Sequence, residues 1–536
     1  MTELDEAYIG TPYTEKTVAG QPSGLFYLFA TEFWERFSYY GMRSLLVLYI
    51  IDTFFQNVDV SERKTIAYGI FGAYGALVYA TPVIGGVIAD KFIGYRKAIT
   101  LGAVLMAIGH LLMAFKGEMM FYAALGLLIV GNGFFKPNIS ALVGSLYPEG
   151  DTRRESGFTI FYMGVNLGAF FSPLVCGWLG MEYGWHYGFG SAGIGMLIGL
   201  IIFLIGTKKN VLGNYGFQPK QYVKHKFLGI PTKEFIYLLS VIAIPLFAFL
   251  VKWNEYNIGP IGMMTFILTS VGIIVLAKLG YHMFEEDKAG AQKIFVVILL
   301  TFFAMVFWSF FEQAGTSLTM FADENVNLPS WCNAAQAQSI NPLVIILFAF
   351  PFAAMWPALA KRELNPNTIV KCFIGLFLLG LGFIVFAYSA NYVDNITGKV
   401  PFLFLALGYF ILTIGELSMS PIILSKVTEL SPTKVVSFML GASMLSSSFA
   451  HHLGGIIAKY TVPSADNGLS NQGFLAELAS GITGFDNSII NKGEGGIDTL
   501  ASSTIVFAQI GVASIIVSLF ILALSPLIRK LMNNVH

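Results

Sequence analysis

Three ionisable residues of the first long apolar segment have the spacing of one helical face. Glu32, Glu35 and Arg36 stand at positions i, i+3 and i+4, so a helix places their side chains on the same side. Tyr40 and Arg43 continue this stripe for two further turns. Because a charge near the centre of a bilayer costs about 2.5 kcal/mol or more, the stripe should face a polar cavity. We predict an acid–base cluster that binds protons, with a purely structural ion-pair cluster as the alternative.

Three more charged residues lie in other apolar segments. Lys136 occurs in GNGFFKPN, Glu312 in FFEQAG and Glu416 in IGELSMSP. Each can be one half of a structural ion pair between helices. Together with the first cluster they make four glutamates and three basic residues, so the fully ionised set has a net charge of −1. One bound proton would neutralise the set, which fits proton coupling, although burial can equally neutralise another member.

Uncharged polar and aromatic side chains inside apolar segments extend the candidate site. Singly, such residues most often make contacts between membrane helices. Beside buried charges, they are candidates to line a substrate cavity. The set consists of Tyr79, Tyr162, Asn166, Trp308, Asn341 and Ser420.

The composition indicates that these residues are held within a membrane. Of 536 residues, 55% are hydrophobic and 12% are charged, whereas about 25% are charged in soluble domains. The net charge of zero gives no reason to expect a nucleic-acid partner. The three cysteines are far apart, the histidines form no ligand motif, and His451–His452 is interpreted as an interfacial pair. With no HExxH, GxSxG or Walker sequence, we expect neither an enzyme nor a bound metal or organic cofactor.

Fourteen apolar segments are long enough to be membrane helices, each of which needs about 20 residues. We predict spans at 25–53, 64–90, 96–115, 119–146, 155–180, 186–207, 233–252, 258–284, 290–323, 341–361, 368–391, 400–429, 433–460 and 500–530. The start of the chain is polar and acidic, and no signal peptide is expected. Gly85–Gly86, Gly131 and Gly133 are predicted to allow close helix packing.

The distribution of lysine and arginine orients the spans. The loops that follow the even-numbered spans contain most of these residues, including Lys91, Arg153 and Lys208. Because basic loops stay on the cytoplasmic side, both termini are expected in the cytoplasm. The long polar segments at 322–340 and roughly 461–499 are then expected outside.

Two short motifs of the chain are distinctive, EFWER at 32–36 and FYMGVNLGA at 161–169. They resemble the ExxER motif and the FYxxIN-G signature of the proton-coupled oligopeptide transporters in the major facilitator superfamily. GGVIADKFIGYRK at 85–97 resembles the superfamily's loop between the second and third spans. The resemblance extends over essentially the whole chain. It implies a proton-driven symporter that imports di- and tripeptides by alternating access.

The resemblance also implies the fold, which is an all-α integral membrane protein with the major facilitator architecture. Two six-helix bundles would occupy 25–207 and 290–536, after a cytoplasmic tail at 1–24. A linker at 208–289 would contain two extra helices similar to those of bacterial members. The implied location is the inner (plasma) membrane of a bacterium. The expected partners are the peptide, the lipid bilayer and protons as the coupling ion, while the oligomeric state is not indicated.

Residue roles carried over from the family fall into three groups. Glu32, Glu35, Arg36 and Lys136 would form the proton-coupling group. Gating salt bridges would join Arg43 to Glu312 and Lys136 to Glu416. The peptide pocket would be lined by Arg36, Tyr40, Tyr79, Lys136, Tyr162, Asn166, Trp308, Asn341, Glu416 and Ser420. Within it, Glu416 would bind the amino terminus of the peptide, and Arg36 with Lys136 its carboxylate.

Two positions depart from the family pattern. The tryptophan that many members carry in the eleventh core helix falls on Ser443, within FMLGASML. The pocket therefore lacks one indole, and its side-chain preference should differ. The histidine that animal members carry in the second helix falls on Gly72. Proton coupling then depends more heavily on the ExxER cluster.

Two other functions are compatible with these features. The same fold can carry another substrate, such as nitrate or an amino-acid derivative, but Glu416 argues against an anion because an acid that binds amines would repel it. A membrane receptor or channel is the second alternative. Intramembrane acid–base pairs in both halves of the chain favour a transporter over a receptor or channel.

Overall fold

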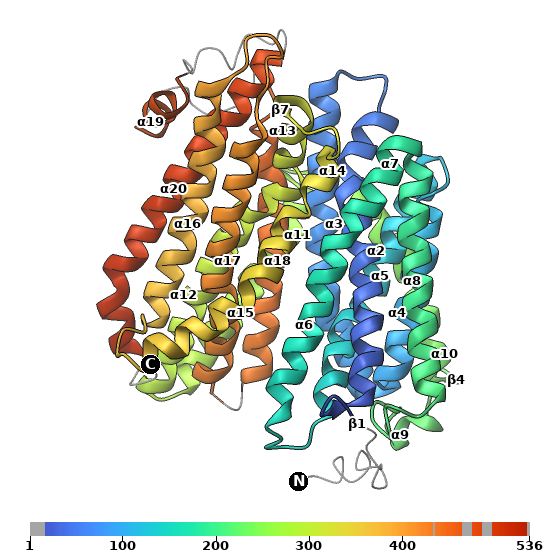
Figure 1. The fold of residues 1–536 in the computed structure, drawn as a ribbon. Helices are drawn as coiled ribbons and strands as arrows, with labels where there is room; N and C mark the ends of the chain where they lie inside the picture. Colours follow the sequence, from blue (N-terminus) through green and yellow to red (C-terminus); the bar gives the residue numbers. More distant parts are fainter. Residues whose placement is uncertain (1–16, 433–434, 464–473, 485–495, 533–536) are drawn as a thin grey trace. The chain divides into compact units, whose positions relative to one another are not determined.

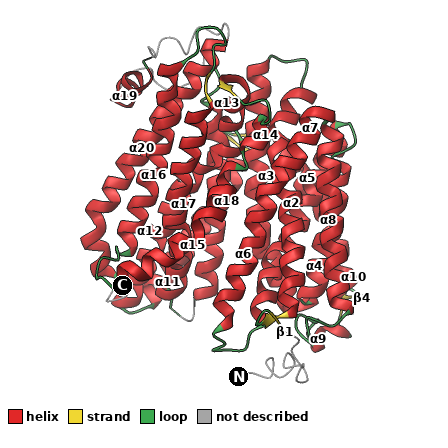
Figure 2. Cartoon of the chain, viewed as in Figure 1, coloured by secondary structure: helices red, strands yellow, loops and turns green. Residues whose placement is uncertain are grey.

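The chain is almost entirely helical in this computed structural model, which describes residues 17–432, 435–463, 474–484 and 496–532. Among the described residues the strands are two residues long, and Figure 2 shows them as short yellow segments between the helices. Within the described residues, most of each predicted span is helical, because an apolar segment in a bilayer must satisfy its backbone hydrogen bonds internally. The span predicted at 258–284 begins later, since α11 starts at Met263. Two of the predicted spans, 155–180 and 290–323, are helices interrupted by a π-helical and a 3₁₀ turn respectively.

The helices divide into two compact units. The first unit comprises residues up to Leu45 together with Leu77–Trp253. Its elements are β1 (Thr17–Val18), β2 (Gln21–Pro22), most of α2 (Ser23–Thr53), the C-terminal part of α3 (Val60–Ile88), η1 (Ala89–Ile93), α4 (Tyr95–Leu112), α5 (Glu118–Ser145), α6 (Arg153–Ser172), η2 (Pro173–Gly177), α7 (Trp178–Tyr183), α8 (Trp185–Lys208), α9 (Lys220–Val223), β3 (Lys226–Phe227), β4 (Ile230–Pro231) and α10 (Thr232–Lys252).

The second unit comprises Leu46–Ala76 and the residues from Asn254 onward. Its elements, besides the remaining parts of α2 and α3, are β5 (Asn257–Ile258), β6 (Ile261–Gly262), α11 (Met263–Glu285), α12 (Lys288–Phe311), η3 (Glu312–Gly315), α13 (Ser317–Asn325), β7 (Val326–Asn327), α14 (Ala334–Ala337), α15 (Ile340–Ala360), α16 (Thr368–Tyr388), η4 (Ser389–Tyr392), β8 (Val400–Pro401), α17 (Phe402–Leu430), α18 (Val436–Lys459), α19 (Phe474–Thr483) and α20 (Gly496–Leu531). Strands β7 and β8 pair in parallel, and each of the other strands pairs with its sequence neighbour.

Close backbone contact between helices holds each unit together. In the first unit, α4 packs against α5 where a methyl group on Gly131 would lie 2.8 Å from the carbonyl oxygen of Gly102. The carbonyl of Gly133 leaves no room for a side chain at Gly85. The predicted packing role of Gly85, Gly131 and Gly133 is confirmed. At Gly86 it is wrong, because a methyl group there would make only an ordinary 3.6 Å contact.

The second unit has the same kind of packing around α16. Figure 1 shows α16 beside both α17 and α20. A methyl group on Gly380 would lie 2.7 Å from the carbonyl oxygen of Gly511 on α20. The rings of Phe383, Phe386 and Phe507 form a cluster with centroids 5.7 to 6.1 Å apart. Small residues therefore allow the helices to approach, and aromatic rings fill the space that remains.

Eleven helical segments in the described part of the chain are long and apolar enough to cross a membrane. The three other predicted spans correspond to α2, α4 and α18, which are helical but do not belong to these eleven. Fourteen spans therefore stay a prediction. The predicted domain limits also stay a prediction, and the two extra helices fall in different units, α10 in the first and α11 in the second. Of the predicted tail, 1–16 lies outside the described residues, as does much of the outer segment 461–499.

We predict that Gly102→Ala destabilises the first unit by about 1 to 3 kcal/mol, the usual cost of overpacking. The added methyl group would lie 2.5 Å from the carbonyl oxygen of Gly131 and 2.8 Å from the backbone nitrogen of Phe135. Backbone atoms within two packed helices cannot move aside easily. The apparent melting temperature of the purified protein, followed by tryptophan fluorescence, should fall. Gly190→Ala in α8 is the matched control, since nothing lies within 4 Å of its methyl group. Equal melting temperatures for the two variants would contradict this account of the packing.

Candidate functional site

Arg36 holds both glutamates of the first-span cluster. Its Nε lies 3.0 Å from Oε1 of Glu32 and also pairs with Oε2 of Glu35. The exposed fractions of Glu32, Glu35 and Arg36 are 4%, 0% and 3%. Helix α2 supplies all three residues, so their arrangement follows from the helical period as predicted. One guanidinium thus neutralises part of the charge of two buried carboxylates.

Lys136 of α5 and Tyr79 of α3 complete this cluster within the first unit. The ammonium nitrogen of Lys136 lies 4.0 Å from the centroid of the Tyr79 ring, a cation–π contact. Lys136 is also close enough to interact electrostatically with Glu32 and Glu35. The predicted proton-coupling group therefore forms one cluster, in which two acids face two bases. Its role in proton transfer stays a prediction.

Aromatic side chains continue the cluster along α2. The guanidinium of Arg43 lies 5.9 Å from the centroid of Tyr40, and that of Arg36 lies 5.4 Å from the centroid of Tyr39. The two tyrosine rings meet edge to face, with centroids 5.2 Å apart. Tyr39 is buried and was not among the predicted site residues. Its position three residues after Arg36 was the sequence signal for this contact.

The candidate residues of α6 differ in their surroundings. Asn166 is buried, and its Nδ2 donates a hydrogen bond of 3.0 Å to the backbone oxygen of Tyr162. The side chain of Tyr162 is 49% exposed within the chain. Its assignment to the peptide pocket stays a prediction.

Glu416 of α17 has its own hydrogen-bond donor in the second unit. Asn341 of α15 donates from Nδ2 to Oε2 of Glu416 at 2.9 Å and approaches the hydroxyl of Thr413 at 3.0 Å. Thr413 lies one turn before Glu416 and in turn donates to the backbone oxygen of Tyr409. Sequence reasoning selected Glu416 and Asn341 but missed Thr413. The structure brings the first two together, although they are 75 residues apart.

The remaining candidates of the second unit lie near the end of α12 and on α17. Trp308 packs edge to face against Phe307 and Phe311, with ring centroids 5.5 and 5.1 Å apart. Ser420 is half-buried one turn after Glu416. Ser443, at the position of the family tryptophan, is half-buried on α18. The assignment of Trp308 and Ser420 to the peptide pocket stays a prediction.

Glu312 forms an ion pair that the sequence did not predict. Its Oε2 lies 3.2 Å from Nδ1 of His451 on α18, and both side chains are buried. The interfacial interpretation of His451 is therefore wrong, because close packing of α18 draws this residue into the protein interior. Neighbouring His452 instead lies 2.8 Å from the hydroxyl of Thr265. The predicted gating pairs, Arg43 with Glu312 and Lys136 with Glu416, join residues of different units and stay predictions.

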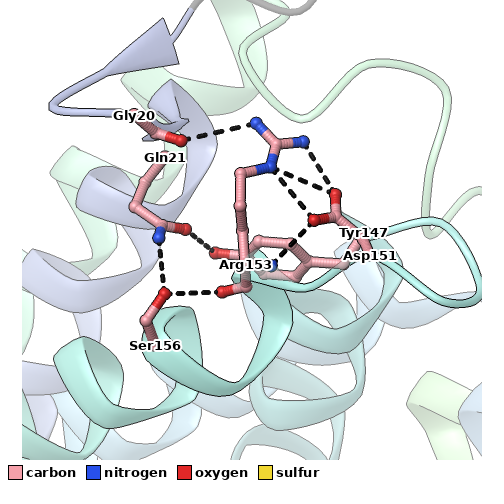
Figure 3. Close-up of polar contacts among 6 residues, drawn as sticks. All are labelled: Gly20, Gln21, Tyr147, Asp151, Arg153 and Ser156. Atoms are coloured by element: carbon pink, nitrogen blue, oxygen red, sulfur yellow. Dashed lines mark hydrogen bonds and ion pairs between the residues drawn. The ribbon is translucent and has the colours of Figure 1, made fainter.

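A second polar network in the first unit holds the segment directly before α2 (Figure 3). Tyr147 donates to the side-chain oxygen of Gln21, and the amide nitrogen of Gln21 donates to Ser156, both at 2.8 Å. Arg153 holds Asp151 through Nε at 3.1 Å and Nη2 at 2.7 Å. Hydrogen bonds from the Arg153 side chain and backbone lower the pKa of Asp151, so the pair stays ionised at neutral pH. Sequence reasoning used Arg153 only to assign the cytoplasmic side.

We predict that Tyr147→Phe lowers stability by about 1 to 3 kcal/mol. The substitution removes the hydroxyl donor and leaves the side-chain amide oxygen of buried Gln21 without this hydrogen bond. The apparent melting temperature should fall, and limited proteolysis should cut the segment before α2 sooner. Tyr183→Phe, on an exposed tyrosine of the same unit, is the control. If both variants melt like the parent, the network does not stabilise the start of α2.

Comparison with known proteins shows the family to which this chain belongs. A family model described as the POT family matches residues 96–472. The uncharacterized transporter YclF of Bacillus subtilis is 34% identical over the whole of both chains. A di-/tripeptide transporter of Lactococcus lactis is 35% identical over 81% of this chain and 88% of that protein. The crystal structure of a peptide transporter, POT, in complex with sulfate is 31% identical, with a TM-score of 0.75 over 99% of this chain and 100% of that one. This chain is an integral membrane protein and belongs to the POT family, the proton-coupled oligopeptide transporters that its motifs resemble.

Proposed function

We propose that this protein is a proton-driven symporter that imports di- and tripeptides across the inner membrane of a bacterium by alternating access. In this proposal both termini lie in the cytoplasm. The observation that carries it is the division of buried charge between the units. The first unit holds Arg36 and Lys136 beside two glutamates, and the second holds Glu416 on an amide donor.

These charges suit the two ends of a peptide. A di- or tripeptide carries an amine at one end and a carboxylate at the other, at a separation set by its backbone. In the proposal Glu416 binds the amine, while Arg36 and Lys136 bind the carboxylate. Recognition of the ends rather than the side chains would admit many sequences. The similarity to a di-/tripeptide transporter supports this substrate class.

Proton coupling follows from the competition for Arg36. In the structure, its guanidinium pairs with both Glu32 and Glu35. A peptide carboxylate that draws this guanidinium away leaves a buried carboxylate with less positive charge nearby. Such a group takes up a proton, because desolvation and the loss of a counter-charge both favour the neutral form. Peptide and proton would then be carried together.

Uptake of radiolabelled dialanine into proteoliposomes tests the proposal. An inward proton gradient should drive accumulation above the external concentration, and a protonophore should abolish it. Excess unlabelled dialanine should compete, whereas nitrate should not, because Glu416 would repel an anion. Gradient-independent uptake, or an ohmic current in planar bilayers, would favour a channel instead.

We predict that Glu32→Gln or Glu35→Gln abolishes gradient-driven accumulation but preserves counterflow. Glutamine keeps the size and hydrogen bonding of glutamate but cannot ionise. Exchange of labelled for unlabelled dialanine needs no net proton movement, so it should persist. Both assays are run on the same liposomes, with Glu118→Gln at the exposed end of α5 as the control. Loss of both activities in folded protein would assign the two glutamates to structure or binding.

We predict that Glu416→Gln loses the preference for a free amino terminus. Uptake of labelled dialanine by the parent should be inhibited by unlabelled dialanine at a concentration roughly tenfold or more below that needed for N-acetyl-dialanine. Acetylation removes the charge of the amine, and leaving one member of a buried charge pair without its partner is costly. The variant should treat both peptides alike. Glu429→Gln on the same helix is the matched control, since Glu429 makes a half-exposed pair with Lys426. Retained discrimination in the Glu416 variant would remove this residue from the amine site.

A further inference from the structure

We propose that His451 is a proton-binding residue of the transport cycle, acting as one half of a buried pair with Glu312. This inference rests on the proposed function, since it assigns a residue to proton-driven transport. The pair belongs entirely to the second unit. It is separate from the cluster of Glu32, Glu35, Arg36 and Lys136, to which the proposed function assigns proton coupling.

The two groups of the pair lie within ion-pair distance of each other. Nδ1 of His451 lies 3.2 Å from Oε2 of Glu312, with 4% and 6% of the respective side chains exposed. A protonated imidazole at this distance would neutralise the carboxylate. Histidine is the side chain best suited to gain and lose a proton near neutral pH. In the proposal the pair takes up a proton and releases it during the transport cycle.

Glycines place the imidazole against α3. A methyl group on Gly75 would lie 2.7 Å from Nδ1 of His451, and one on Gly72 would lie 3.2 Å from its backbone oxygen. Any side chain at these two positions would occupy the space that the histidine fills. On the other side, a methyl group on Gly454 would lie 3.1 Å from Cβ of Glu312. Small residues therefore allow α18 to place one imidazole between α3 and η3.

Glu312 stands at a break in the helix. Glu312 is the C-terminal cap of α12, and the 3₁₀ turn η3 begins there. The partial negative charge at a helix C-terminus disfavours a carboxylate there, so a proton on His451 or on Glu312 would be favourable at this point. Gln313 fixes the break by donating 2.9 Å to the backbone oxygen of Gly454.

Other titratable groups around the pair set its response to substrate. Helix α17 contributes Glu416, which interacts electrostatically with Glu312. Helix α18 itself contributes His452, which is bonded to Thr265, and Lys459, which pairs with Glu255. Helix α3 presents Gly72 and Gly75, which do not titrate. A proton on the pair would lower the repulsion between Glu312 and Glu416, and would let Glu416 stay charged for the peptide amine. Proton binding and amine binding would then support each other.

The test compares His451→Gln with His452→Gln in proteoliposomes. We expect His451→Gln to lose gradient-driven accumulation of dialanine and to flatten the pH dependence of uptake, because glutamine cannot take up a proton. Counterflow at saturating dialanine should persist at the rate of the parent, since exchange needs no net proton movement. His452→Gln, next along the same helix, should keep the parent's accumulation and pH profile.

A second measurement does not depend on transport. Dialanine is added to purified protein in weakly buffered detergent, and a pH indicator reports protons taken up or released. The parent and His452→Gln should give the same pH-dependent proton exchange, and His451→Gln should give less. Unchanged accumulation and proton exchange in His451→Gln would overturn the inference. Loss of counterflow in folded His451→Gln would also overturn it, by assigning the residue to structure or binding. Absence of gradient-driven uptake in the parent would refute the proposed function instead.

Discussion

A guanidinium buried between two carboxylates is the interaction on which the first unit depends. Neither Glu32 nor Glu35 could stay charged in an apolar helix alone, because desolvation would neutralise it or expel it from the interior. Arg36 pairs with both acids, and Lys136, which also lies against the ring of Tyr79, adds a second positive charge close to them. The ionisation of each member therefore depends on the charge of the others. A change of charge nearby, from substrate or proton, alters which members are ionised.

The second unit handles its buried acids differently. Glu416 is held by an amide, and Glu312 by an imidazole at a helix break. An amide cannot neutralise a carboxylate, and an imidazole does so only when protonated. The two acids therefore differ in the chemistry of the partner that the second unit gives them. A buried acid inside a membrane-spanning segment is a candidate for function, because its charge is costly in hydrocarbon.

Close backbone approach makes these arrangements possible. Glycines at the crossings of α4 with α5, of α16 with α20 and of α3 with α18 remove the side chains that would separate the helices. Where the backbones touch, one larger side chain can be inserted at a defined place, as His451 is beside Gly75. Membrane helices gain little from hydrophobic burial against one another, because lipid tails are equally apolar. Close contact of this kind therefore has to determine which helices pack together.

Local pattern determined the helical segments and the shared face of Glu32, Glu35 and Arg36, because hydropathy and the helical period act over a few residues. It also indicated the family, because the characteristic motifs are short and each lies within a single segment of the chain. Tertiary structure alone decided which helices touch. It placed Asn341 on Glu416, Gln21 on Ser156 and His451 on Glu312, pairs that lie far apart in the sequence. No periodicity encodes such pairs, because they depend on where whole helices cross and on which glycines let them approach.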